Sequence, residues 1–150
     1  MSLGSGHVMR CLTLADRLRD LGANVGFICK ESAGNLIDFI RETGGFAVDS
    51  LPGNPPLSLS SYGVDAEQTI NILQKKQHLI DWLIIDHYAL DHRWECVVNR
   101  NVKKIMVIDD LANRSHECDL LLDQNYSQKK NRYQELIPKT CRQLLGPKYI

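Results

Sequence analysis

The sequence predicts an α/β domain with a mainly parallel sheet, and its pattern indicates this in three ways. Short apolar segments alternate with amphipathic helical segments along most of the 150 residues. The segments at 82–85, 104–108 and 119–122 are apolar apart from Lys104 and Asp119 at their starts, as in strands buried on both faces. Each of them is followed at once by polar side chains. We therefore expect a Rossmann-like sheet with helices on both faces, formed by one domain over residues 1–150.

The first part of the chain predicts two helices and two strands. Residues 7–21 place apolar side chains on one helical face, and Gly22 suits the end of that helix. A short buried strand at 25–29, a helix at 35–42 and a strand at 46–51 follow. The segment 52–63 is rich in Pro, Ser and Gly and predicts a loop, either a flap near a site or a plain surface excursion.

The rest of the chain repeats the alternation. A helix is expected at 65–77, and the strongest strand of the chain at 82–85. Asp91 is a suitable cap for a helix that reaches about residue 100. Further strands are expected at 104–108, 119–122 and 143–145.

Composition limits the classes of function. The chain is 43% hydrophobic and 24% charged, as ordinary soluble globular proteins are. Lysine plus arginine and aspartate plus glutamate number 18 each, so no overall charge favours nucleic acid or an anionic membrane. No apolar run reaches the length of a membrane span. We expect a cytoplasmic protein that binds neither nucleic acid nor membrane.

The cysteines and histidines predict no metal site. The 5 cysteines are scattered and form no Cys-x-x-Cys pair, so buried reduced thiols are expected. The nearest approach to a metal cluster is His116-Glu117-Cys118, whose spacing matches no zinc pattern. We interpret His116 as structural, and the pair Trp94-Glu95 as a core residue followed by a surface residue.

Polar residues follow three of the predicted strands and should share one rim. Asp86 and Tyr88 follow the strand at 82–85, Asp109 follows the next, and Asn125 the one after. Parallel α/β sheets bind ligands off the carboxyl ends of their strands. Tyr88 could bind a sugar or phosphate, or be a half-buried aromatic residue. Asp109 and its neighbour suit a ribose or metal site, or a capping role.

A second candidate site lies where a small-residue loop meets the first helix. Gly4, Ser5 and Gly6 allow close approach to a ligand, and a helix start offers unpaired N–H groups to an anion. The positive helix end disfavours a charged imidazole, so His7 is suited to accept a proton. His7 would sit on the same rim. Arg10 could face a phosphate or lie solvated. The loop could also be a remnant of a linker.

Six stretches together resemble one enzyme family. They are 4–15, 84–88, 91–95, 108–114, 118–126 and 144–149. The family is that of the UDP-2,4-diacetamido-2,4,6-trideoxy-β-L-altropyranose hydrolases of pseudaminic acid biosynthesis. The family is similar to spore-coat polysaccharide biosynthesis proteins. Its two-domain fold is similar to that of glycosyltransferase B enzymes.

The resemblance implies the reaction and the roles. Water would attack the anomeric carbon of a UDP-linked sugar, with His7 as the base and Tyr88 close to the sugar or the water. Gly4, Ser5, Gly6, Arg10, Asp86, Asp109 and Asn125 are the expected substrate contacts, and no cofactor or metal is implied. Alternatives are a non-catalytic domain that binds a nucleotide sugar or a partner, and half of a sugar transferase.

Two parts of the family pattern are missing from this sequence. The family has a strand before the glycine loop and a second domain that grips the UDP. The sequence therefore resembles the N-terminal half of such an enzyme, inactive or weakly active alone. The expected partner is the missing C-terminal domain, and a second copy in a homodimer could fill the place of the missing strand.

Overall fold

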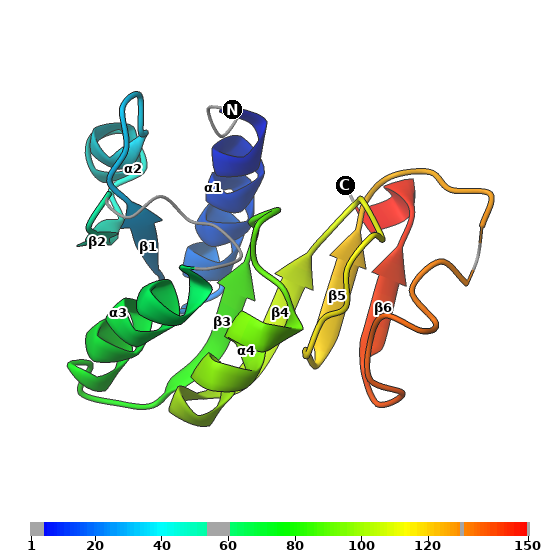
Figure 1. The fold of residues 1–150 in the computed structure, drawn as a ribbon. Helices are drawn as coiled ribbons and strands as arrows, with labels where there is room; N and C mark the ends of the chain where they lie inside the picture. The colour runs from blue at the N-terminus through cyan, green and yellow to red at the C-terminus, as the bar shows by residue number, and fades with distance from the viewer. Residues whose placement is uncertain (1–4, 54–60, 130, 150) are drawn as a thin grey trace. The chain divides into compact units, whose positions relative to one another are not determined.

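The computed structural model describes residues 5–53, 61–129 and 131–149. They belong to two compact units, Met1–Pro56 and Leu57–Ile150. Figure 1 follows the chain through both. Each unit contains a parallel sheet with helices beside it, so the predicted α/β class is confirmed. Most of the loop expected at 52–63 lies outside the described residues.

The first unit contains two helices and two strands. They are α1 (Ser5–Asp20), β1 (Gly26–Lys30), α2 (Ile37–Glu42) and β2 (Ala47–Leu51). The two strands are parallel, with a register from Gly26 opposite Ala47 to Lys30 opposite Leu51. All four elements lie within a few residues of the predicted positions, because apolar periodicity and flanking glycines marked them well.

Gly22 ends α1 as the sequence predicted. Its φ of 90° lies in the left-handed region, which costs glycine nothing. Its N–H bonds to the carbonyl of Arg19 at 2.9 Å, and the N–H of Ala23 bonds to that of Leu18 at 3.0 Å. These two bonds form a Schellman motif, which satisfies carbonyl groups left open at the helix end.

The core of the first unit lies between α1, α2 and the strands. Leu12, Ala15, Ile40 and Phe46 are buried there, with Phe27 packed against them. The rings of Phe27 and Phe46 are 5.3 Å apart and tilted, as aromatic pairs prefer. Gly44 is needed at the end of α2, because a Cβ there would lie 2.7 Å from the carbonyl oxygen of Ile40.

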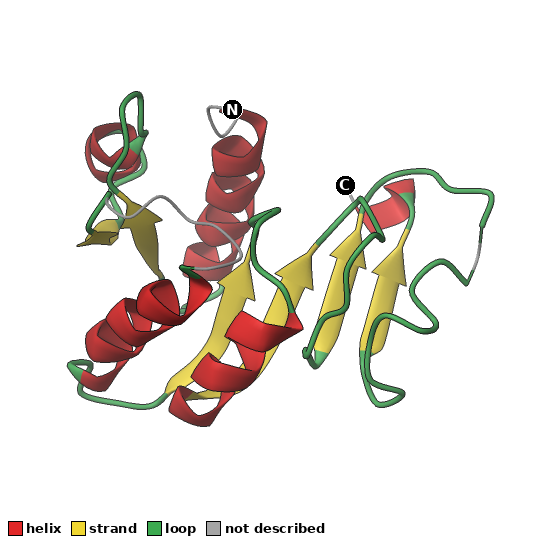
Figure 2. Ribbon diagram, in the orientation of Figure 1, coloured by secondary structure: helices red, strands yellow, loops and turns green. Residues whose placement is uncertain are grey.

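The second unit is built on a four-stranded parallel sheet. Its elements are α3 (Tyr62–Gln74), β3 (Ile80–Ile85), α4 (His92–Val98), η1 (Asn99–Asn101), β4 (Val102–Ile108), β5 (Leu120–Asp123), β6 (Arg142–Leu145) and η2 (Pro147–Tyr149). The strands lie in chain order, β3-β4-β5-β6, and all run the same way (Figure 2). Their carboxyl ends therefore meet at one edge, as the sequence analysis expected.

Helices α3 and α4 pack together, and in Figure 1 α4 lies in front of β3 and β4 while α3 lies to the left of β3. Buried Trp94 of α4 donates its indole N–H to the carboxylate of Asp65 of α3 at 2.9 Å. Asp91 caps α4 as predicted, because its Oδ1 accepts the N–H of Arg93 at 3.0 Å. Helix α3 begins at Tyr62, three residues earlier than expected, and includes Gly63 in its first turn.

The expectation that Glu95 lies on the surface is wrong. Its side chain is 0% exposed, whereas Val97 on the same helix is 45% exposed. The Glu95 carboxylate accepts two hydrogen bonds, from Nδ1 of His116 at 2.7 Å and from the N–H of Glu117 at 2.5 Å. A segment about twenty residues further along the chain thus supplies the donors that a buried carboxylate requires. His116 is itself buried, in line with the structural role expected for it.

Candidate functional site

Three side chains converge at the carboxyl edge of the second unit's sheet. Tyr88 follows β3, Asp110 follows β4 and Asn125 follows β5. The Tyr88 hydroxyl donates to Oδ2 of Asp110 at 3.2 Å, and Nδ2 of Asn125 donates to the same oxygen at 3.3 Å. Tyr88 and Asn125 are both exposed at this edge of the sheet. We refer to Tyr88, Asp110 and Asn125 as the strand-end cluster.

A buried layer beneath this cluster fixes the ends of β4 and β5. Asp109, Asp123 and Tyr133 are each 2% exposed or less. The Tyr133 hydroxyl lies 3.1 Å from a carboxylate oxygen of Asp109 and 3.1 Å from one of Asp123. A hydroxyl has one proton to donate, so it serves one carboxylate at a time. Arg114 pairs with Asp109 at 2.7 Å and Arg132 with Asp123 at 3.2 Å, which offsets the two buried charges.

The electrostatics of this layer keep Asp109 ionised and Tyr133 protonated. Burial alone would raise the pKa of Asp109, but the N–H of Ala112 bonds its Oδ2 at 2.9 Å and Arg114 lies beside it. Together these contacts hold the pKa of Asp109 below its ordinary value. Burial and the charges of Asp109 and Asp123 raise the pKa of Tyr133. Tyr133 is therefore a neutral donor between two carboxylates.

Asp109 and Asp110 differ in position although they are adjacent. Asp109 points into the buried layer, and Asp110 is the one that contacts Tyr88 and Asn125. Asp86, also expected at the rim, follows β3 and is half-buried. Its neighbour His87 accepts the N–H of Ala89 on Nδ1 at 3.1 Å, which shapes the turn that carries Tyr88.

Sequence reasoning missed Arg114, which joins two of the loops. Its guanidinium donates to the carbonyl oxygens of Leu90 at 2.8 Å and His87 at 3.3 Å, in the loop after β3. The same group pairs with Asp109 after β4 and lies 6.0 Å from the centre of the Tyr88 ring. Arg114 is the last residue of the stretch 108–114, which carried the family resemblance. Its place in that stretch was the only feature of the sequence that could have indicated a role for it.

His7 lies in the first unit, in the first turn of α1, as predicted. Nη2 of Arg10 lies 3.0 Å from Nδ1 of His7. A guanidinium can only donate, so Nδ1 supplies the lone pair and the proton of the neutral ring is on Nε2. A contact on the next turn of α1 thus sets the tautomer of the candidate base.

The glycine loop is described only in part. Gly4 lies outside the described residues, and Ser5 is the first residue of α1. Gly6 is in the first turn, is exposed, and a Cβ built on it would meet nothing within 4 Å. Packing among the described residues therefore does not require glycine at position 6.

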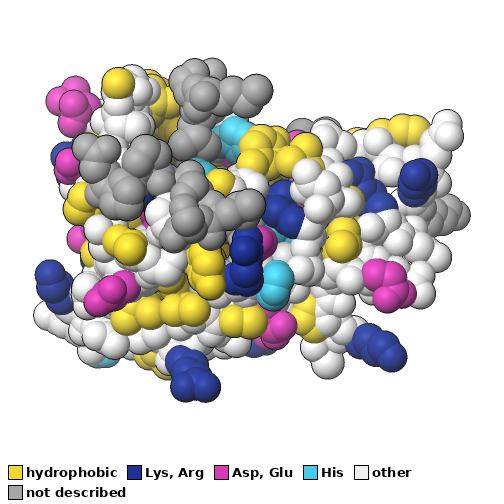
Figure 3. All heavy atoms as spheres, viewed as in Figure 1, with side chains coloured by type: hydrophobic (Ala, Val, Ile, Leu, Met, Phe, Trp, Pro, Cys, Tyr) yellow, Lys and Arg dark blue, Asp and Glu magenta, His cyan; other side chains and the backbone are white. Residues whose placement is uncertain are grey.

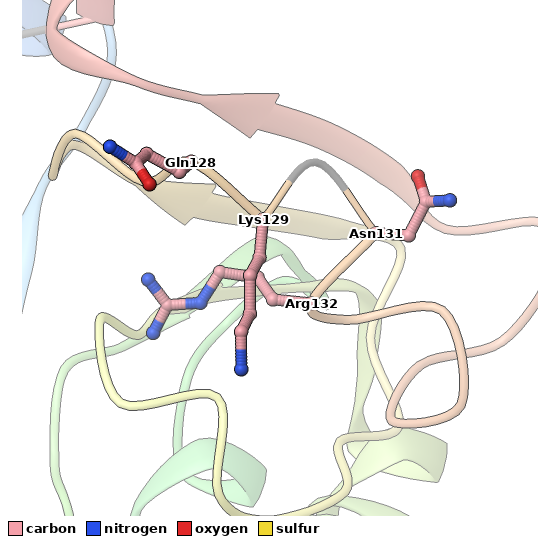
Figure 4. Close-up of a pocket in the computed structure, with 4 residues that line it drawn as sticks. All are labelled: Gln128, Lys129, Asn131 and Arg132. Atoms are coloured by element: carbon pink, nitrogen blue, oxygen red, sulfur yellow. The ribbon is translucent and has the colours of Figure 1, made fainter.

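A basic pocket lies beside the buried layer. Gln128, Lys129, Asn131 and Arg132 line this open pocket of about 410 Å³ (Figure 4). Arg132 also donates to the backbone oxygen of Asp110 at 2.7 Å, which connects the pocket wall to the strand-end cluster. Elsewhere on the visible surface, basic side chains are interspersed with acidic and apolar ones (Figure 3), in line with the zero net charge.

Within the described residues, no group of three or more His, Cys, Asp or Glu side chains is placed to hold a metal ion. No helix in the same part of the chain is both long and apolar enough to cross a membrane.

Comparison with known proteins gives one relative. No protein-family model matches the chain. The chain is 32% identical over 148 residues to the UDP-2,4-diacetamido-2,4,6-trideoxy-beta-L-altropyranose hydrolase of Campylobacter jejuni. The match covers 98% of this chain and 46% of that protein, so the chain spans about half the length of the relative.

Proposed function

We propose that this chain supplies the catalytic base and the sugar contacts of a hydrolase that acts on a UDP-linked diacetamido-trideoxy sugar. The observation that carries the proposal is the similarity to a hydrolase of that name over 98% of the chain. The strand-end cluster adds physical support, because a phenol, a carboxylate and an amide at one sheet edge are suited to sugar hydroxyl and acetamido groups.

In the proposed reaction, water attacks the anomeric carbon and the bond from that carbon to the phosphate oxygen breaks. The bonding electrons leave with UDP, which departs as an anion and needs no strong acid. His7 accepts the proton of the attacking water, and the product is the free sugar. Tyr88 contacts the sugar or the water, while Gly6, Arg10, Asp86 and Asn125 contact the substrate.

Arg10 has a specific part in this proposal. The Nδ1 lone pair of His7 is the one that can accept a proton, and Arg10 donates to it in the structure. A substrate phosphate binds a guanidinium better than a neutral imidazole does, because the bond is charge-assisted on both sides. Substrate binding would then draw Arg10 from Nδ1 and free the base. Further contacts to the diphosphate would come from the part of such an enzyme outside the matched segment.

The test is a chimera in which this chain replaces the matched segment of the Campylobacter jejuni hydrolase. We expect it to release UDP from the UDP-sugar. His7→Ala should lower the turnover rate by about 10²-fold or more, the usual contribution of a general base, without abolishing substrate binding. His78→Ala, at an exposed histidine of the second unit, is the control and should leave the rate unchanged.

Three outcomes would contradict the proposal. If His7→Ala kept near-normal turnover, His7 would not be the base. If the folded chimera bound the UDP-sugar but released no UDP, a non-catalytic binding domain would be favoured. Transfer of the sugar to an added acceptor instead of water would favour a transferase.

A further inference from the structure

Two buried cysteines face each other at the start of β5 and β6. Cys118 and Cys141 are 6% and 8% exposed, and their sulfur atoms are 3.6 Å apart. The other three cysteines differ from them: Cys11 and Cys29 are half-buried and Cys96 is exposed. The pair lies outside the strand-end cluster and has no part in the proposed hydrolysis.

The backbone around this pair is already aligned for a covalent link. Cys118 lies two residues before β5 and Cys141 directly before β6, and these strands are parallel neighbours, with Leu120 opposite Arg142. The N–H of Arg142 bonds the carbonyl oxygen of Asp119 at 2.9 Å, which fixes the register beside the two thiols. A disulfide needs a sulfur–sulfur distance of about 2.05 Å, so side-chain rotation has to close only about 1.5 Å.

The two thiols are hydrogen-bonded to each other, and either sulfur can be the donor. Cys141 also donates to the carbonyl oxygen of Arg142 at 3.5 Å. Thiol–disulfide exchange begins with a thiolate, and a second thiol then resolves the mixed disulfide. The pair therefore supplies one thiol that can attack and a neighbouring thiol that can resolve.

We propose that Cys118 and Cys141 form a reversible disulfide when the protein meets a low-molecular-weight disulfide such as glutathione disulfide. One of the two cysteines, as its thiolate, attacks one sulfur of the reagent and displaces the first thiol. The other cysteine then attacks the protein sulfur of the mixed disulfide and displaces the second. The protein loses two protons and two electrons, and one reagent disulfide becomes two thiols.

The bond would act on one loop of the second unit. It encloses residues 119–140, which include β5, Asn125 and Tyr133. The link is at the amino ends of β5 and β6, whereas the strand-end cluster is at the carboxyl ends of β3 to β5. The oxidised form should therefore resist unfolding and proteolysis within this loop, with the cluster geometry unchanged.

Peptide mapping of the unsubstituted chain tests the proposal directly. After incubation with glutathione disulfide, free thiols are alkylated in denaturant and the digest is analysed by mass spectrometry without reduction. We expect a linked pair of peptides containing Cys118 and Cys141, two hydrogen masses lighter than the sum of the free peptides, which disappears after reduction.

Variants give the controls. Cys96→Ser should leave the link intact, because Cys96 is exposed and the 3.6 Å sulfur contact joins Cys118 to Cys141. Cys118→Ser should abolish the link and leave glutathione on Cys141. The proposal is overturned if Cys118 and Cys141 of the unsubstituted chain remain fully alkylatable after Cys96 has reacted completely. A link between other cysteines overturns it as well, and neither result depends on a variant that folds.

Discussion

Replacing Glu95 by Gln should weaken the second unit strongly, although the change is nearly isosteric. The Glu95 carboxylate is fully buried, with one oxygen 2.7 Å from Nδ1 of His116 and the other 2.5 Å from the N–H of Glu117. An amide retains one acceptor oxygen and presents an NH₂ group in place of the other. If the amide oxygen keeps His116, the N–H of Glu117 faces the NH₂ group. If it keeps Glu117, Nδ1 of His116 can accept from the NH₂ group only by moving its proton to Nε2, which is buried and has no hydrogen-bond partner among the described residues.

The magnitude follows from these two contacts. A buried donor without an acceptor costs about 1–3 kcal/mol, and a hydrogen bond to a charged group contributes about 1.5–3 kcal/mol. The two effects overlap at one side chain, so we expect Glu95→Gln to lower the free energy of unfolding by about 2–4 kcal/mol. At about 2–4 °C per kcal/mol for a chain of this size, Tm should fall by about 5–15 °C.

The assay is urea unfolding followed by tryptophan fluorescence. The chain has 2 tryptophans, Trp82 in β3 and Trp94 in α4, so the signal reports the second unit alone. Glu67→Gln, at an exposed position of α3, is the matched control and should change stability by less than about 0.5 kcal/mol. If Glu95→Gln behaved like Glu67→Gln, the two hydrogen bonds would not hold the loop against α4, and the reasoning would be refuted.

Three further predictions concern pH and the glycines. The pKa of Asp109 is lowered in the folded state, so its charge contributes to the free energy of unfolding above the unfolded pKa of about 4, and this contribution is lost as pH falls through the folded pKa. Asp109→Asn should therefore reduce the loss of stability at acid pH, measured by urea unfolding at several pH values. The pKa of Tyr133 is raised in the folded state, so its protonated hydroxyl contributes to the free energy of unfolding below the unfolded pKa of about 10, and this contribution is lost as pH rises further. Tyr133→Phe should lower stability at neutral pH and remove the loss of stability at alkaline pH. An unchanged loss at alkaline pH would contradict this. Gly6→Ala and Gly63→Ala each add a methyl group in open space in the first turn of a helix, so each should be neutral or stabilising by up to about 1 kcal/mol. Only Gly6→Ala should weaken binding of the UDP-sugar, measured by calorimetry. Equal binding by both variants would exclude close approach of the UDP-sugar to Gly6.

The elements and the edge that carries the cluster were predictable from the sequence, because those signals are local. Apolar runs marked the strands, Asp91 marked the start of α4, and Gly22 marked the end of α1. The consecutive order of the strands then brings their polar ends together without any further information.

The sequence could not tell which of two adjacent aspartates faces outward. The last four residues of β4 are all buried, so alternation gives no polar side against which Asp109 and Asp110 could be assigned. Glu95 was predicted on the surface because the helical pattern contains no information about its donors, His116 and Glu117, which lie outside the helix. Tyr133 lies in a segment without helix or strand and therefore carried no periodic signal.

The contacts of Arg114 bear on how the rim can change over evolution. Its guanidinium holds the loop after β3 through the carbonyl oxygens of His87 and Leu90, which every amino acid possesses. Side chains in that loop can therefore be exchanged without loss of the tether. Arg114 itself, fixed by the carboxylate of Asp109, cannot be exchanged so freely. This arrangement separates the residues that determine loop position from those that determine what the rim recognises, so recognition can diverge while the scaffold is inherited unchanged.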